Sequence, residues 1–228
     1  CSNTSAVVSV MVNTLPIATI TVSGAQTFCD GDSVVLTASS ANAYLWSNGE
    51  QTASITVKVS GLYNVKVTDQ NNCSATSNNR SVIVNPLPLA KISAIGSTTF
   101  CEGDSVTLTA SSADKYLWNS KATTASITVK NSGSFDVLIT DANGCSSKSN
   151  TTQVIMNQLP LAEITVQQSP VLCDGDSVIL MASKGQSYLW SNGSALPTLV
   201  VKQSGLYKLT VTDGNGCSAT TKSIKVGI

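Results

Sequence analysis

Apolar and polar residues alternate along most of the chain in short runs. In residues 33–39, for example, Val34, Leu36 and Ala38 share one face, and small polar residues lie opposite. A period of two over short runs, broken by segments such as SG, SNG and VSG, predicts half-buried antiparallel strands. No segment keeps a period of 3.6 residues, so we expect almost no helix. Within residues 13–84 the predicted strands are 18–22, 33–39, 44–46, 54–59, 62–69 and 80–84.

The whole pattern recurs with a period of 72 residues. CDGDSVVLTASSANAYLWSNG begins at Cys29, CEGDSVTLTASSADKYLWNSK at Cys101 and CDGDSVILMASKGQSYLWSNG at Cys173, without insertion or deletion. The first twelve residues align with the end of the next copy, so we interpret them as the C-terminal strand of a truncated preceding repeat. The predicted domains are therefore this strand, 1–12, and three repeats, 13–84, 85–156 and 157–228.

Alternation also predicts which side chains face inward. Few of them are bulky, and six or seven short strands per repeat suit a small sandwich of two sheets. Proline-containing joints, NTLP, NPLPLA and NQLPLA, separate the repeats and should be semi-stiff. We therefore expect an all-β fold of three sandwiches in an extended rod, each about 35 Å long. The predicted inward positions are Val34, Leu36, Ala38, Tyr44, Trp46, Ile55, Val57, Val59, Tyr63, Val65 and Val67; Val106, Leu108, Trp118, Ile127, Val129, Phe135, Val137 and Ile139; and Val178, Leu180, Trp190, Leu199, Val201, Tyr207, Leu209 and Val211.

Composition narrows the function. Charged residues make up 11% of the chain and balance to zero, so neither a nucleic-acid footprint nor a membrane-attracting basic face is present. No apolar run is long enough to cross a bilayer. Histidine is absent, and no nucleophile elbow or phosphate-binding loop is found, so we expect no enzyme. The polar, weakly charged surface is common in extracellular domains, and the chain is expected to be monomeric.

Four motifs recur at fixed spacing in all three repeats: C-[DE]-G-D-S-V-x-L, YLW, SG-x-[YF] and TD-x-[NG]-x-C-S. Together they resemble the immunoglobulin-like and PKD-like repeats of large secreted or cell-surface proteins of Bacteroidetes, including adhesins exported by the type IX system. The resemblance implies immunoglobulin-like sandwiches, surface display or secretion, no catalysis along the array, and a role in adhesion or as a stalk.

The sequence departs from an antibody domain at its cysteines. In that domain the paired cysteines lie within two strands, whereas Cys29 precedes a predicted strand and Cys73 follows one. Tyr63 begins a strand as a tyrosine-corner residue does, but it lies ten positions before Cys73 rather than two. The antibody disulfide therefore does not carry over.

The seven cysteines divide into two per repeat plus Cys1. Repeated cysteine pairs in a weakly charged β array point to an oxidising compartment. The simplest pairing, which we favour, lies within each repeat. Immunoglobulin topology speaks against it, since it places the two turns at opposite ends of a sandwich, too far apart for a disulfide. Bonds between neighbouring repeats and free thiols stay open as alternatives. The pairings are Cys29–Cys73, Cys101–Cys145 and Cys173–Cys217 within repeats, or Cys29–Cys145 and Cys101–Cys217 between them.

Carboxylates near these cysteines offer hard oxygen ligands for calcium, the one cofactor that the sequence suggests. Three per repeat are few for a six- to eight-oxygen shell, and Asp and Gly are also the residues that tight turns require. We therefore favour a turn as the reason for C-[DE]-G-D. Zinc is not expected without histidine or a C-x-x-C spacing. The candidate calcium ligands are Asp30, Asp32, Asp69, Glu102, Asp104, Asp141, Asp174, Asp176 and Asp213.

Two further motifs admit a functional interpretation. The single tryptophan of each repeat could stack on a sugar, although its alternating position favours the core. The DSV triplets resemble the O-glycosylation sequon of Bacteroidetes, which makes Ser33, Ser105 and Ser177 candidate acceptors; a strand that begins with small polar residues explains them equally well.

The leading hypothesis from the sequence is a non-enzymatic spacer or stalk of a large surface or secreted protein. The alternative is a binding module for polysaccharide or protein in each repeat. A third hypothesis places a catalytic domain outside this sequence. Exposed aromatic side chains would favour binding, whereas buried Tyr44 and Trp46 would favour the spacer.

Overall fold

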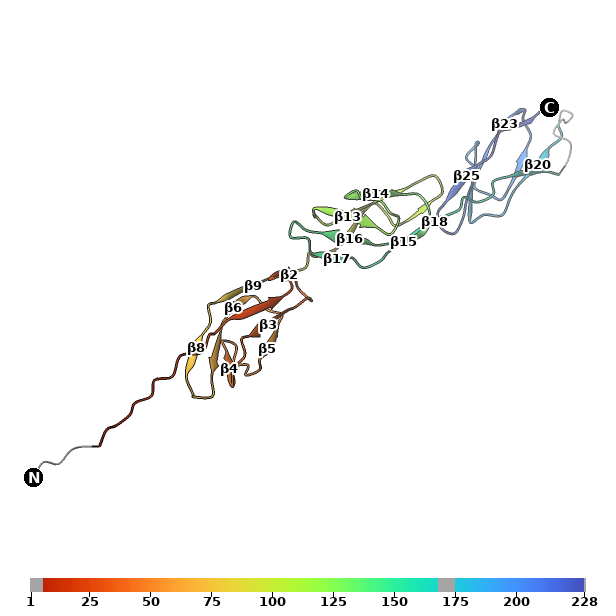
Figure 1. Cartoon of the computed structure of the whole chain (residues 1–228). Coiled ribbons are helices and arrows are strands. Elements are labelled where there is room, and N and C mark those ends of the chain that lie inside the picture. The colour runs from red at the N-terminus through yellow and green to blue at the C-terminus, as the bar shows by residue number, and fades with distance from the viewer. Residues whose placement is uncertain (1–5, 168–174, 228) are drawn as a thin grey trace, which may run out of the picture. The chain divides into compact units, whose positions relative to one another are not determined.

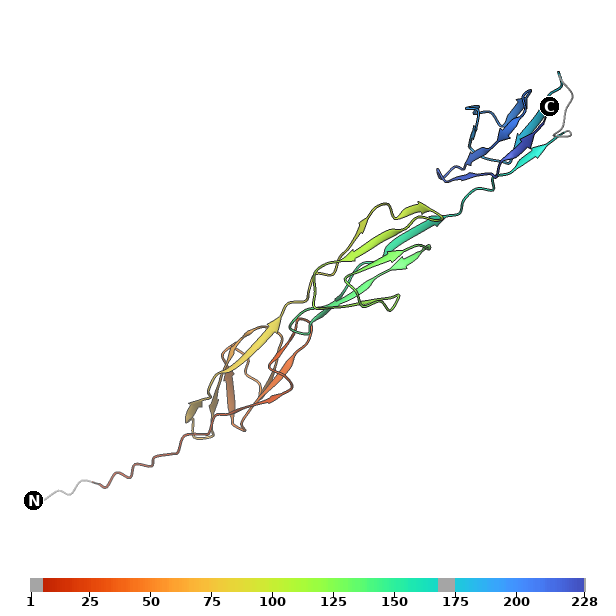
Figure 2. The same cartoon turned by 90° about the horizontal axis from the view of Figure 1, so that it is seen from above.

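The computed structural model describes residues 6–167 and 175–227, and the protein is all-β. Figures 1 and 2 draw its strands as arrows joined by loops, and the described residues contain no helix, as the alternating pattern predicts. By contacts between residues, the chain divides into two compact units. One consists of Cys1–Leu89 with Ile139–Ser147, and the other of Ala90–Leu138 with Lys148–Ile228.

The same succession of short strands occurs in the first two 72-residue repeats, and the described residues of the third follow it. The first has β1 (Ile20–Ser23), β2 (Thr27–Cys29), β3 (Val34–Ala38), β4 (Ala43–Trp46), β5 (Ser54–Val57), β6 (Gly61–Tyr63), β7 (Val65–Thr68), β8 (Ser74–Thr76) and β9 (Arg80–Asn85). The second has β10 (Ile92–Ile95), β11 (Thr99–Cys101), β12 (Val106–Ala110), β13 (Lys115–Trp118), β14 (Ser126–Val129), β15 (Gly133–Phe135), β16 (Val137–Thr140), β17 (Ser146–Lys148) and β18 (Thr152–Asn157). The third has β19 (Ile164–Val166), β20 (Val178–Ala182), β21 (Ser187–Trp190), β22 (Thr198–Val201), β23 (Gly205–Tyr207), β24 (Leu209–Thr212), β25 (Ser218–Thr220) and β26 (Ile224–Val226).

Two layers of strands make up each repeat. In the first repeat, one layer is the antiparallel sheet β1-β3-β5, and the other contains the sheets β4-β7-β8 and β2-β9-β6. Since β6 continues into β7 and β8 into β9, the layers correspond to strands A-B-E and A′-G-F-C of an immunoglobulin-like sandwich. The short strand β2 runs parallel to β9 and places Cys29 opposite Asn85.

The predicted inward positions largely form the core. Val34, Leu36, Val65 and Val67 of the first repeat are almost completely buried. The tryptophans are equally buried, and each indole N–H donates to a backbone carbonyl six residues on, which satisfies its one polar group. These tryptophans are Trp46, Trp118 and Trp190.

One predicted core position is wrong. Val59 is 69% exposed, because β5 ends at Val57 and the alternation continues beyond the ladder without a partner strand. Two strands, β2 and β8, were also absent from the prediction, since three-residue runs are too short to show a period of two.

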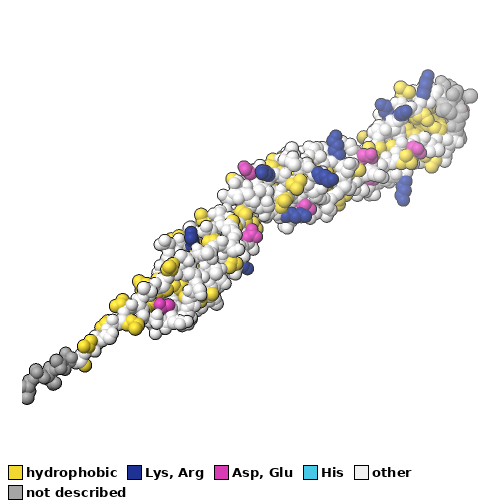
Figure 3. Space-filling model, viewed as in Figure 1, with side chains coloured by type: hydrophobic (Ala, Val, Ile, Leu, Met, Phe, Trp, Pro, Cys, Tyr) yellow, Lys and Arg dark blue, Asp and Glu magenta, His cyan; other side chains and the backbone are white. Residues whose placement is uncertain are grey.

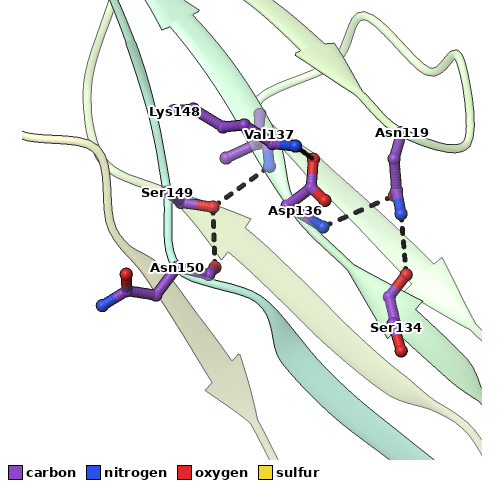
Figure 4. A network of polar contacts seen from close by, with 7 residues as sticks. All are labelled: Asn119, Ser134, Asp136, Val137, Lys148, Ser149 and Asn150. Atoms are coloured by element: carbon purple, nitrogen blue, oxygen red, sulfur yellow. Dashed lines mark hydrogen bonds and ion pairs between the residues drawn. The ribbon is translucent and has the colours of Figure 1, made fainter.

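A buried hydroxyl fills a gap where the strand pair F–G changes register. In the second repeat, the Ser149 hydroxyl accepts from Val137 N at 3.1 Å and donates to Asn150 O at 2.9 Å (Figure 4). The Ser149 N–H returns a bond to Val137 O at 2.9 Å. The hydroxyl thus supplies the acceptor that an extra residue in the G strand removes from the ladder, as expected at a β-bulge. Ser77 and Thr221 occupy the same place in the other repeats.

Candidate functional site: the turns that carry the cysteines

The C-[DE]-G-D motif forms a tight turn between β2 and β3. Asp32 N donates to Cys29 O at 3.1 Å, and Gly31 between them has a φ of +100°. A positive φ at the third residue is the feature of a type II turn that requires glycine. Asp30 N also donates to Asn85 O at 2.8 Å, which ties the turn to the end of β9. The motif is therefore a turn, as favoured from the sequence, and Cys101–Asp104 repeats the same bond.

The second cysteine of each repeat lies on the F–G turn, which an aspartate organises. In the first repeat, Asp69 Oδ1 accepts from the backbone N–H groups of Asn71 and Cys73, both at 2.9 Å. Asp69 N donates to Cys73 O at 3.0 Å and closes the turn. Asp141 and Asp213 make the same bonds in the other repeats. Each of these carboxylates thus has a local structural role.

Two disulfides join consecutive repeats. Cys29 bonds Cys145 and Cys101 bonds Cys217, each pair with its Cα atoms 5.5 Å apart. The sequence separation is 116 residues in both cases. Cys145 and Cys217 are completely buried, whereas Cys73 is a partly exposed free thiol. We call each such bond between a C-[DE]-G-D cysteine and the F–G cysteine of the following repeat a staple.

The pairing within repeats, favoured from the sequence, is wrong for Cys29, Cys73, Cys101, Cys145 and Cys217, and Cys73 forms no disulfide. Cys29 lies opposite the last residue of strand G, while Cys73 immediately precedes that strand. From Ser74 to Asn85 an extended strand rises roughly 35–40 Å. A disulfide needs Cα atoms within about 7 Å, so strand G itself keeps the two cysteines apart. Cys1 and Cys173 lie outside the described residues.

Calcium ligation gains no support from the carboxylate positions. Among residues 6–167 and 175–227, no three acidic, histidine or cysteine side chains form a group that could hold a metal ion. The side chains of Asp30, Asp32, Glu102, Asp104 and Asp176 are exposed. Asp174 lies outside the described residues, and a calcium site stays a prediction from the sequence alone.

The aromatic side chains do not form an exposed platform. The tryptophans are buried, and Tyr44 is half-buried against the first core, with its hydroxyl accepting from Ala41 N at 3.0 Å. The buried tryptophan of each repeat is therefore not placed to stack on a sugar. Tyr188 in the third repeat repeats the bond of Tyr44, to Gly185 N.

The SG-x-[YF] motif is a packing device at the edge of the sandwich. A Cβ on Gly61 would lie 3.3 Å from the Tyr63 ring, so glycine lets the ring fold back over the backbone. The Tyr63 hydroxyl donates to Val59 O at 3.0 Å, four residues upstream. Tyr207 does the same to Gln203 O. Phe135, which has no hydroxyl, replaces tyrosine in the second repeat, and a cavity of about 510 Å³ opens beside it and the half-buried Ile127.

The three candidate glycosylation sites differ in exposure. Ser33 and Ser105 are exposed and Ser177 is half-buried, and their glycosylation stays a prediction. On the face shown in Figure 3, acidic and basic side chains lie scattered rather than gathered. None of the described segments is a helix of the length and hydrophobicity that crossing a bilayer takes.

Comparison with known proteins does not assign the chain to a family. No family model matches the chain, and no curated protein sequence matches it. Solved structures similar to it include the ICAM-5 D1–D4 ectodomain fragment, with 12% identity, a TM-score of 0.44 and coverage of 93% of this chain and 76% of that chain. A 1.5-MDa bacterial ice-binding adhesin shows 14% identity, a TM-score of 0.36 and coverage of 94% and 98%. Three N-terminal domains of the bacteriophage RB49 outer capsid protein Hoc show 15% identity, a TM-score of 0.34 and coverage of 92% and 98%. Likenesses this distant carry no argument about function.

Proposed function

We propose that the chain is a non-enzymatic, extracellular repeat array that serves as a stalk or spacer in a large bacterial surface adhesin or secreted modular protein. The observation that carries the proposal is the pair of staples, Cys29–Cys145 and Cys101–Cys217. Each adds a second covalent connection between repeats that the chain already joins through a short proline-containing segment.

The staples support an extracellular location, because disulfides persist in oxidising compartments and are rare in the cytosol. The repeat motifs support a bacterial surface protein through their resemblance to arrays exported by the type IX system. Both arguments point to a protein that acts outside the cell.

The same bonds support a mechanical role. A joint with one covalent connection swivels about its linker, whereas a second covalent connection restricts that motion. A spacer benefits from this restriction, because it must hold its ends apart. The repeats also use their tryptophans in the core and the three F–G-turn aspartates in the turns themselves, which fits a structural role for these side chains.

Small-angle scattering of oxidised and reduced protein tests the stalk. A compact globule of this length has a radius of gyration of about 17 Å. For an extended array we expect a clearly larger value, with a broader distance distribution after reduction and alkylation. The double variant Cys29→Ser/Cys145→Ser should broaden it without reductant. A radius near that of a globule, or no change on reduction, would remove the basis for a spacer.

A repeated apolar position favours protein binding as the second candidate function. Leu45, Leu117 and Leu189 occupy the same place on β4, β13 and β21 and are 48%, 49% and 57% exposed. Aliphatic side chains suit a protein surface better than a sugar, which prefers an aromatic face. Leu117→Ser should abolish capture of a protein partner and leave folding intact, whereas an unchanged interaction would count against this surface.

A further inference from the structure

The F–G turn of the first repeat has the same geometry as the two that carry staples. Cys73 N donates to Asp69 Oδ1 at 2.9 Å, as Cys145 N does to Asp141 Oδ1. Cys145 differs from Cys73 in being completely buried and bonded to Cys29, whereas Cys73 is a half-exposed free thiol. The F–G turn of the first repeat therefore has the geometry of a turn that carries a staple, but its cysteine forms no disulfide.

A second observation comes from the segment that precedes the first repeat. Residues 8–12 correspond, one period earlier, to Arg80–Val84 of β9, and Asn13 corresponds to Asn85. Val82 of β9 is buried, whereas its counterpart Val10 is 81% exposed. In the first repeat, β9 pairs in parallel with the strand that carries Cys29, and Cys29 is bonded to Cys145 on the F–G turn of the following repeat.

We infer that Cys73 is the acceptor of a further staple. Its partner is the C-[DE]-G-D cysteine of the repeat to which residues 8–12 supply the last strand, on a short strand that pairs with residues 11–13. The parallel pair places that cysteine opposite Asn13, as Cys29 lies opposite Asn85. The inference concerns how repeats are joined, and it holds whether or not the array serves as a stalk.

Formation of the staple is a thiol–disulfide exchange with a low-molecular-weight disulfide as oxidant. The Cys73 thiolate attacks the oxidant, forms a mixed disulfide and releases one small thiolate, which takes up a proton. The partner cysteine, as thiolate, then attacks the Cys73 sulfur and expels the second small thiolate. Two protein thiols are oxidised, and one small disulfide is reduced to two thiols.

The test extends the chain at its N-terminus with a copy of residues 13–72, which completes a repeat in register with residues 1–12. After oxidation in a glutathione buffer, the protein is alkylated and digested with trypsin. The peptide 67–80 contains Cys73 as its one cysteine. In the chain of 228 residues Cys73 should be found alkylated or bonded to glutathione, and not bonded to another cysteine of the protein. In the extended chain its alkylation should fall to background, and the peptide should appear bonded to the one that carries the added cysteine.

A matched control replaces the added cysteine with serine, which should return Cys73 to its alkylated and glutathione-bound forms. Several outcomes would overturn the inference: Cys73 still alkylated in the oxidised extended chain, Cys73 bonded to Cys173 of a second copy, or the added cysteine bonded elsewhere. Failure of the added repeat to fold, seen as an exposed additional tryptophan, also counts against it, because the extension reproduces a boundary that the chain uses twice. None of these readouts depends on the radius of gyration that tests the stalk.

Discussion

The first and second repeats share one backbone frame, and the differences between them include the following three. Cys73 is a free thiol where Cys145 carries a staple. Tyr63 donates to a backbone carbonyl where phenylalanine cannot. Asn72 holds a φ of +60° where Gly144 holds +82°. The last two differences are local to a repeat, whereas the staple depends on the neighbouring repeat. The difference separates what a repeat encodes by itself from what the array adds.

The staple should have the largest effect. Cys29→Ser/Cys145→Ser removes a cross-link that spans 116 residues, which restricts the unfolded chain. Chain-entropy arguments give a loss of about 5 kcal/mol when the linked repeats unfold together. Denaturant unfolding followed by tryptophan fluorescence measures it. Using serine at both positions avoids an unpaired thiol.

Cys73→Ser is the matched control, because it changes the same turn where no staple exists. It should leave the free energy of unfolding within about 0.5 kcal/mol of the parent. Equal losses in the two variants would show that the thiol matters through local packing, and the contrast between the repeats would then disappear.

Replacing the turn aspartates should have the next largest effect. Asp69→Ala and Asp141→Ala each remove an acceptor for two backbone N–H groups, at a cost of about 1–2 kcal/mol. Because Asp141 also positions Cys145, its loss should accelerate reduction of the staple by dithiothreitol. Asp141→Asn keeps the oxygen acceptor and should reduce at nearly the parent rate. A staple whose reduction rate is the same in all three proteins would exclude the positioning role.

The extent to which the sequence predicts this fold depends on the range of each interaction. Alternation identifies β3, β5 and β7 and their buried residues because side-chain direction follows from the backbone period. It misses β2, whose three residues exist as a strand only through pairing with β9. It also misses the role of Ser77 and Ser149, although a serine recurring between polar residues just before the last strand is a usable signal.

The cysteine pairing could not be read from periodicity, because every scheme that respects the repeat has the same period. Strand topology decides it. Once Cys29 is known to lie at the end of strand G, the length of that strand excludes Cys73. The topological objection raised from the sequence was correct, and the preference for the simplest pairing was not.

A tyrosine at position 135 should strengthen the second repeat modestly. In the first and third repeats the tyrosine hydroxyl donates to the carbonyl four residues upstream. Phe135→Tyr should form the same bond with Asn131 O, beside the open cavity, and stabilise the repeat by about 1 kcal/mol. Tyr63→Phe should cost the first repeat a similar amount. If Phe135→Tyr does not stabilise the second repeat while Tyr63→Phe destabilises the first, the ring at position 135 is placed differently from that at position 63.

The residue in the left-handed position of the F–G turn should have the smallest effect. Asn72 has a φ of +60° there, and asparagine tolerates this conformation better than most residues but less well than glycine. Asn72→Gly relieves that strain and also makes the unfolded chain more flexible, so the two effects oppose each other. We expect a net change of about 0.5 kcal/mol or less, measured by thermal unfolding with the reciprocal Gly144→Asn as control. Because Gly144 lies next to the stapled Cys145, that control should cost more than Asn72→Gly gains; equal and opposite changes would mean that the staple places no extra demand on the turn.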